Sequence, residues 1–222
     1  MRFPTKPDER LFLLAEQLNP DTPVVFFDYD GVFNPLNVVD QWVGEGEPST
    51  LDYVFRDPKK WEVVELPVDG STHYNPDCTG EADHEDRTYV VKWSSELVEE
   101  LNWLVSSSKV QVVWLTTWRQ DVNTLVPLMG LETGVTWLPW RKSGAGVQTV
   151  GKAQALAEFL DVFKTVHGQE ARYVWVDDQE TGAFLPPSSL KLPYRGVILQ
   201  PQSEYGLSRA QGETMRRDLQ AR

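Results

Sequence analysis

The sequence has little cysteine and no long apolar run, and each absence argues against a class of protein. Cys78 is the single cysteine among 222 residues, so no disulfide forms within the chain. A chain without disulfides suits a reducing compartment, and we expect a cytoplasmic protein. No apolar run approaches the roughly 18 residues that a membrane helix needs. The first ten residues contain no apolar core of a signal peptide. We therefore expect no membrane segment.

Positive charge is also scarce, since 21 Lys and Arg stand against 33 Asp and Glu, a formal net charge of −12. This balance disfavours non-specific binding to nucleic acid or anionic membrane, although a local basic groove is compatible with it. Hydrophobic residues make up 41% and charged residues 24%, which is typical of a globular protein. The length suits one α/β domain, so we expect residues 1–222 to form a single domain. Nothing in the composition indicates a stable protein partner.

Apolar strands and amphipathic helices alternate along most of the chain. Short continuous apolar runs predict buried strands at 24–27, 110–115, 135–138, 173–176 and 197–199. Helical spacing predicts helices at 8–19, over Leu97 to Leu104 behind a Ser94 or Ser95 cap, at 119–129, over Ala153 to Phe163, and at 208–221. The alternation indicates a Rossmann-like, doubly wound, mostly parallel sheet. Residues 32–92 interrupt it, and we expect a small cap insertion there.

Polar residues follow three of the predicted strands. Asp28 and Asp30 end the first strand, and Thr116 ends the second. Asp177 and Asp178 end the fourth. In an open parallel sheet the ligand crevice lies at the carboxyl ends of the strands, so these side chains can converge although they are distant in sequence. Three such endings are hard to explain as turns alone, and we interpret them as a functional site.

The acidic residues of this site suggest a bound metal ion. Asp28 and Asp30 project to the same side of the chain, and neighbouring carboxylates repel each other unless a cation lies between them. Magnesium prefers oxygen ligands, and Asp28, the main-chain carbonyl of Asp30 and Asp178 would suit it, with Asp177 as a helper. The order of Asp177 and Asp178 in these two roles stays open. Lys152, a compact positive charge, would hold Asp28 and a phosphoryl group together.

This ordered set of residues resembles the haloacid dehalogenase (HAD) superfamily of phosphohydrolases. The four motifs match, in the family order, at Asp28-Tyr29-Asp30-Gly31-Val32, at Thr116 after an apolar strand, at Lys152, and at Asp177-Asp178. The resemblance spans residues 24–199, which is most of the chain. The stretches VVWLTTWR and VWVDD are also similar to a subgroup of small HAD domains, some of which resemble RNA-repair domains.

The resemblance implies a magnesium-dependent phosphatase with a HAD-like fold. In that scheme Asp28 attacks phosphorus to form an aspartyl-phosphate, and Asp30 protonates the leaving alcohol and then activates water. Thr116 donates its hydroxyl to a phosphate oxygen, while Lys152 and the metal neutralise charge on the transferred group. Thr117 and Arg119, which follow the second motif, are expected to bind substrate. The substrate is then a small phosphorylated molecule or a nucleic-acid end.

Two other functions use the same residues. One is a nucleic-acid end-processing phosphatase or phosphotransferase, in which Trp42 and Trp61 of the insertion would stack on a base or sugar. Arg119, Arg141 and Lys142 would then bind a second phosphate or a nucleic-acid backbone. Ordinary packing and salt bridging also account for these five residues, and the acidic balance weighs against nucleic acid. The other is a phosphate-binding module that has kept the site and lost turnover.

Overall fold

A computed structural model describes most of the chain. It covers residues 8–35, 51–56, 62–67, 73–85, 87–107, 109–140, 151–179 and 196–220. Trp42, Trp61, Arg141 and Lys142 lie outside these ranges. No helix within them is both long enough and apolar enough to cross a membrane.

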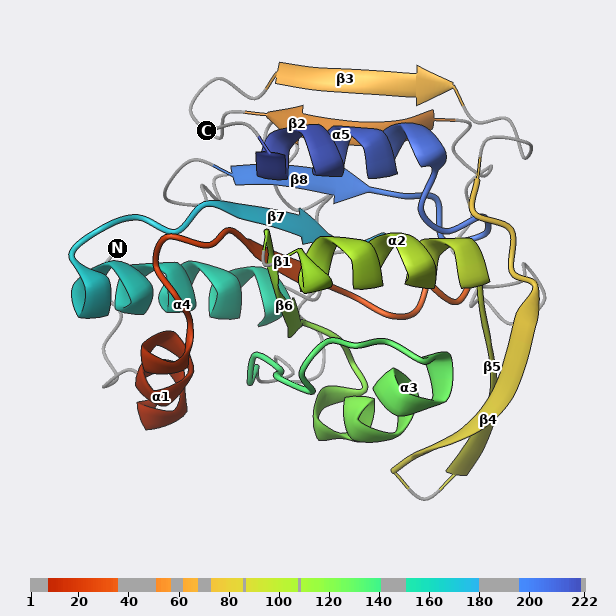
Figure 1. Cartoon of the computed structure of the whole chain (residues 1–222), viewed down its shortest axis with the longest axis horizontal. Helices are drawn as coiled ribbons and strands as arrows, with labels where there is room; N and C mark the ends of the chain where they lie inside the picture. The colour runs from red at the N-terminus through yellow and green to blue at the C-terminus, as the bar shows by residue number, and fades with distance from the viewer. Residues whose placement is uncertain are drawn as a thin grey trace.

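The described strands form a six-stranded sheet and a separate hairpin (Figure 1). The parallel strands of the sheet are β1 (Val24–Phe27), β6 (Gln111–Trp114), β7 (Tyr173–Val176) and β8 (Gly196–Gln200). They stand in the order β8-β7-β1-β6, which requires the crossover connections of a doubly wound fold. Two antiparallel strands extend the β8 edge, β2 (Leu51–Arg56) and then β3 (Glu62–Pro67). The predicted α/β class is confirmed.

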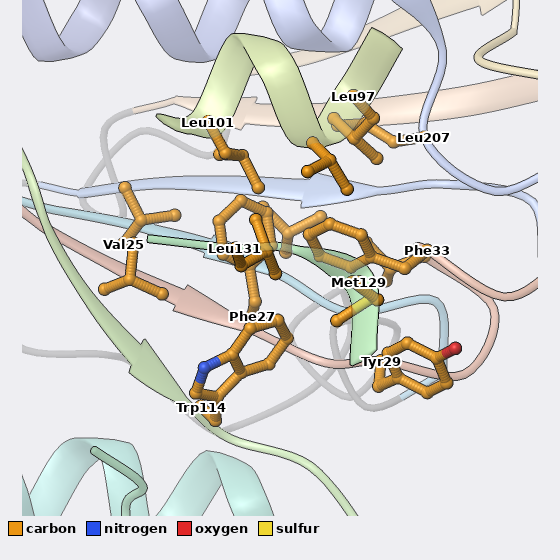
Figure 2. Packing of buried hydrophobic residues seen from close by; sticks show 14 of the residues in the cluster. Val25, Phe27, Tyr29, Phe33, Leu97, Leu101, Trp114, Met129, Leu131 and Leu207 are labelled. Carbon is orange, nitrogen blue, oxygen red and sulfur yellow. The ribbon is translucent and has the colours of Figure 1, made fainter. Parts of the chain in front are cut away.

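Helices cover both faces of the parallel strands, which explains why all four residues of β1 are buried. One face packs against α2 (Ser95–Ser106), α3 (Val122–Met129) and α5 (Arg209–Gln220). The other face packs against α1 (Glu9–Gln17) and α4 (Gly151–His167). Side chains alternate along β1, so Val25 and Phe27 enter the first cluster, and Val24 and Phe26 enter the second. Figure 2 shows the first cluster.

Two of the predicted elements differ from the observed ones. Residues 119–129 begin with a 3-10 turn, Arg119–Asp121, before α3. Residues 135–138 form a single bridge beside β6, from Trp137 to Trp114, and not a full strand. The ladder stops there because the carbonyl of Thr116 is occupied by other donors, the Nε1 of Trp140 at 2.9 Å and the main-chain N–H of Arg119 at 3.3 Å.

The described parts of the expected insertion, 32–92, have two different structures. β2 and β3 join the edge of the main sheet, which the sequence did not predict. β4 (Cys78–His84) and β5 (Arg87–Trp93) instead form an antiparallel hairpin. In Figure 1 this hairpin extends from the end of the molecule toward which the arrows of β7 and β8 point. It therefore lies on the carboxyl side of the sheet, and its role as a cap stays a prediction.

Gly196 allows β8 to pack beside Tyr173 of β7. A Cβ atom at position 196 would lie 2.1 Å from the Tyr173 ring, which is itself buried. We expect Gly196→Ala to lower the free energy of unfolding by about 1–3 kcal/mol in urea denaturation. The control is Gly134→Ala, whose Cβ would meet the Thr136 hydroxyl at an ordinary 3.6 Å and should change stability by under about 0.5 kcal/mol. Equal stability of the two variants would contradict the β7–β8 packing.

Candidate functional site

The carboxyl ends of β1 and β7 bring three acidic residues together. Main-chain hydrogen bonds continue past the ends of the strands, from Asp28 N to Val176 O at 2.9 Å and from Asp177 N to Leu199 O at 3.2 Å. Asp28, Asp177 and Asp178 are all buried, and each places a carboxylate oxygen within 4.8 Å of the others. The parallel register thus joins the first and fourth predicted motifs, which are far apart in the sequence.

Lys152 lies in the first turn of α4 and connects two of these carboxylates. Its side chain is only 4% exposed, and its Nζ donates to Asp28 Oδ2 and, at 3.0 Å, to Asp177 Oδ2. Asp28 Oδ1 also accepts the main-chain N–H of Tyr29 at 2.7 Å. An ammonium between two buried carboxylates stabilises their ionised forms, because it offsets both the loss of hydration and the repulsion between them. Lys152 therefore contacts Asp28, and its part in holding a phosphoryl group stays a prediction.

One ammonium does not balance three buried carboxylates. Burial raises the pKa of Asp28 to about 7. The positive charge of Lys152 opposes this rise, and the negative charge of Asp177 adds to it. Burial and the negative charges of Asp177 and Asp28 raise the pKa of Asp178 well above its usual value. Burial lowers the pKa of Lys152, but Asp177 and Asp28 more than offset that effect and raise it. These four side chains thus carry an excess of negative charge among the described residues, which protons or a bound cation would neutralise.

Asp178 packs against the turn that follows β1. A Cβ atom on Gly31, whose φ is +71°, would lie 2.2 Å from Asp178 Oδ2, so no larger residue fits there without displacing the carboxylate. The same oxygen accepts a hydrogen bond from the hydroxyl of Ser203, in the loop after β8. Asp177 differs, since its Oδ1 accepts the main-chain N–H of Gln179 at 3.0 Å and its Oδ2 contacts Lys152. Asp178 is therefore the member of the pair that Lys152 does not hold, which suits the ligand role predicted for it.

Asp30 lies apart from this acidic group. Its Oδ1 accepts from Asn34 Nδ2 and its Oδ2 accepts from Trp118 Nε1, both at 2.9 Å. Its carboxylate is not among the three that approach one another, so a metal contact by Asp30 stays a prediction for its main-chain carbonyl. Sequence reasoning missed Asn34, Trp118 and Ser203. Trp118 and Ser203 reach their partners only through the tertiary fold, across 88 and 25 residues. Asn34 lies four residues after Asp30 in the same loop, but no sequence pattern marked it.

The residues of the second motif lie in the turn after β6. Thr116 is buried and its hydroxyl accepts the main-chain N–H of Trp118 at 3.3 Å. Thr117 is exposed. Arg119 is half-buried, has a φ of +51°, and places its guanidinium 5.0 Å from the centroid of the Trp140 ring. The contacts of Thr116 and Arg119 thus run within this turn and to Trp140, and substrate contacts by Thr116, Thr117 and Arg119 stay predictions.

A cavity of about 280 Å³ lies beside the loop that carries Asn34. Its lining comes from that loop, from the segment before β4, from β5 and from the loop after β8, and consists of Pro35, His73, Asn75, Pro76, Lys92, Glu204 and Tyr205. Pro35 follows Asn34, the partner of Asp30, and Glu204 follows Ser203, the partner of Asp178. The side chain of Tyr205 is 42% exposed and contacts the His73 ring, with 5.3 Å between centroids. The cavity therefore adjoins residues that hold two of the acidic side chains.

Comparison with known proteins agrees with this geometry. Residues 24–211 match a family described as the HAD domain in Swiss Army Knife RNA repair proteins. Searches among curated proteins and among solved structures found no match. The matched range contains Asp28, Lys152 and the Asp177–Asp178 pair, so the predicted resemblance to the HAD superfamily and its RNA-repair subgroup is confirmed. Because the match covers most of the chain, the protein belongs to this family of HAD domains.

Proposed function

We propose that the protein is a magnesium-dependent phosphohydrolase that acts on a phosphomonoester through an aspartyl-phosphate on Asp28. The observation that carries this proposal is the buried group of three carboxylates and one ammonium at the carboxyl edge of the sheet. Such a group is costly to bury without a function, since each unbalanced charge loses its hydration. Membership of a HAD family supports the same chemistry.

The residues of the site fit a divalent cation. With Lys152 charged and the three carboxylates ionised, the group carries two excess negative charges within one small volume. Asp28, Asp178 and Asp177 supply only oxygen ligands, which is the donor set that magnesium prefers. When bound, the ion would stabilise negative charge on the transferred phosphoryl group as a Lewis acid.

The protein's own residues would carry out the covalent steps. A carboxylate oxygen of Asp28 forms a bond to phosphorus while the bond from phosphorus to the leaving oxygen breaks, and Asp30 gives its proton to that oxygen. Asp30 then takes a proton from a water molecule whose oxygen attacks phosphorus. The bond between phosphorus and Asp28 breaks, which releases phosphate and restores the carboxylate. Lys152 keeps Asp28 in position and offsets charge through both steps.

Replacing the nucleophile tests the covalent scheme. We expect the wild type to release phosphate from 4-nitrophenyl phosphate only with magnesium, and Asp28→Asn to lose at least about a thousandfold in kcat/KM. Asp21→Asn is the matched control, because Asp21 is exposed just before the opposite end of β1. Full activity in Asp28→Asn would rule out the aspartyl-phosphate. Binding of beryllium fluoride without turnover of any phosphate ester would instead favour a non-catalytic module.

The charge excess predicts a pH-dependent stability. A carboxyl whose pKa is raised by folding binds its proton more tightly in the folded state, so its contribution to stability falls as pH rises. Without metal, Asp178→Asn should therefore stabilise the protein at pH 8 by roughly 1–2 kcal/mol, or about 2–8 °C in Tm, and much less at pH 5.

Magnesium separates this electrostatic effect from simple repacking. It should raise the Tm of the wild type at pH 8 more than at pH 5, and should raise that of Asp178→Asn less at either pH, as measured by calorimetry. An Asp178→Asn variant that is destabilised equally at both pH values, with an unchanged response to magnesium, would contradict the proposed metal site.

A second candidate is phosphate removal from a nucleic-acid end. The description of the matched family, which names RNA repair proteins, favours it. The cavity beside Asn34 adds a structural reason, because the exposed ring of Tyr205 and the side chain of Lys92 suit a base and a backbone phosphate. The net charge of −12 opposes it by disfavouring a long nucleic-acid footprint. A contact limited to the last nucleotides of a nucleic-acid end would use the cavity and would still be compatible with the negative net charge.

Oligonucleotides of different length distinguish the two substrates. If the substrate is a nucleic-acid end, kcat/KM should be about tenfold or more higher for a 3′- or 5′-phosphorylated oligonucleotide than for the mononucleotide. Tyr205→Ala should then raise KM for the oligonucleotide and leave 4-nitrophenyl phosphate unaffected. Trp103→Ala is the control, since Trp103 is an exposed aromatic residue outside the cavity. Indifference to chain length would remove the nucleic-acid candidate and leave the small-molecule phosphatase.

A further inference from the structure

The carboxylate of Asp30 is held at both of its oxygens by donors from different parts of the chain. Asn34, in the loop after β1, donates to Oδ1, and Trp118, in the turn after β6, donates to Oδ2. Each hydrogen bond is 2.9 Å long. Two N–H groups on opposite oxygens fix the rotation of the carboxylate as well as its position.

Trp118 is itself held by aromatic contacts with three rings, two of which come from the hairpin. It is only 3% exposed. Its ring lies 5.7 Å from that of Tyr29, 5.7 Å from that of Tyr89 and 4.7 Å from that of His84, measured between centroids. His84 ends β4 and Tyr89 belongs to β5. His84 Nδ1 also lies 2.8 Å from Asp121 Oδ2, which ties the hairpin to the turn that follows Trp118.

Asn34 has a second contact to the same hairpin. Its Oδ1 accepts the main-chain N–H of Lys92 in β5 at 3.2 Å, while its Nδ2 donates to Asp30. The carbonyl of Lys92 in turn accepts from the Tyr29 hydroxyl at 3.3 Å. Both donors of Asp30 therefore contact the β4–β5 hairpin directly, through side chains in one case and through the main chain in the other.

We propose that Trp118 and Asn34 are positioning residues, which orient Asp30 for proton transfer and couple that orientation to the β4–β5 hairpin. This proposal rests on the proposed function, in which Asp30 protonates the leaving oxygen. Both residues act through Asp30 and not on the substrate. The hairpin then influences the reaction by fixing the donors of Asp30.

The simpler interpretation is that Trp118 only fills the core. Trp118→Phe separates the two, because it keeps an aromatic ring and removes the Nε1–H. A packing role predicts equal effects on all substrates, through lost stability. A positioning role predicts an effect that grows with the need to protonate the leaving group, since 4-nitrophenolate leaves readily without a proton and an alkoxide does not.

The kinetic experiment compares ethyl phosphate with 4-nitrophenyl phosphate under magnesium. For Trp118→Phe and Asn34→Ala we expect kcat to fall about tenfold or more on ethyl phosphate and less than about threefold on 4-nitrophenyl phosphate, with KM little changed. Trp103→Phe, at an exposed position on α2, should match the wild type on both. Equal losses on the two substrates, or no loss, would overturn the positioning role.

The link to the hairpin is tested with His84. His84→Ala removes a ring that contacts Trp118 without touching Asp30. It should lower kcat on ethyl phosphate about two- to tenfold, which is a part of what a general acid contributes to the rate, and leave 4-nitrophenyl phosphate little changed. Wild-type kinetics in His84→Ala on both substrates would overturn the coupling to the hairpin.

A measurement without turnover keeps this proposal separate from the proposed function. In ¹⁵N-labelled protein the Trp118 indole N–H resonance is identified by its loss in Trp118→Phe. Asp30→Asn should shift that resonance, because the indole donates to Asp30, and His84→Ala should shift it as well. A wild type that hydrolyses neither ester would overturn the phosphatase function. An indole resonance unmoved by Asp30→Asn would overturn the positioning contact whether or not the protein is active.

Discussion

The ammonium of Lys152 between Asp28 and Asp177 is the interaction on which the rest of the site depends. It joins the first turn of α4 to the carboxyl ends of β1 and β7, so three elements must be in register before it forms. It also lets the fold bury carboxylates that would otherwise repel each other. One positive charge nevertheless falls short of three negative ones. The same contact that assembles the site therefore leaves it short of positive charge and suited to a cation.

Packed aromatic rings support the elements that carry these charged side chains. Phe27 contacts Phe33 and Trp114 on one face of the sheet, and Tyr29 stacks on Phe33 (Figure 2). These rings are buried and pack at edge-to-face, tilted and stacked angles, and Tyr29 also contacts Trp118, which holds the loop after β1 close to the turn after β6. The side chains of Asp28 and Asp30 contact different partners. The first reaches Lys152, and the second reaches Asn34 and Trp118.

The acidic group could be predicted from the sequence because each of its residues directly follows a short apolar strand, and a parallel sheet brings such ends to one edge. Trp118 and Asn34 could not be found in this way. Trp118 looks like a core residue, and its Nε1–H matters only because Asp30 lies opposite it. The addition of β2 to the edge of β8 was also missed, since an antiparallel partner across 140 or so residues leaves no local pattern. The strand ends carried a recognisable pattern, whereas the contact of Trp118 with Asp30 spans 88 residues and the contact of Asn34 with Asp30 lies in a loop without one.

The two aspartates of the first motif differ in ways that suit two tasks. Asp28 is buried beside a cation, so its negative charge is held in one place and offset there. Asp30 is half-buried and is held by two N–H groups, which can donate hydrogen bonds but are far too weakly acidic to supply a proton. They can orient its carboxylate without competing for the proton that Asp30 gives and takes in the proposed mechanism. In the proposed mechanism, the proton would then move only between Asp30 and the leaving alcohol or the attacking water. In the proposed mechanism, a fixed nucleophile and an oriented proton carrier would thus arise from residues two positions apart, because the fold places different neighbours around each.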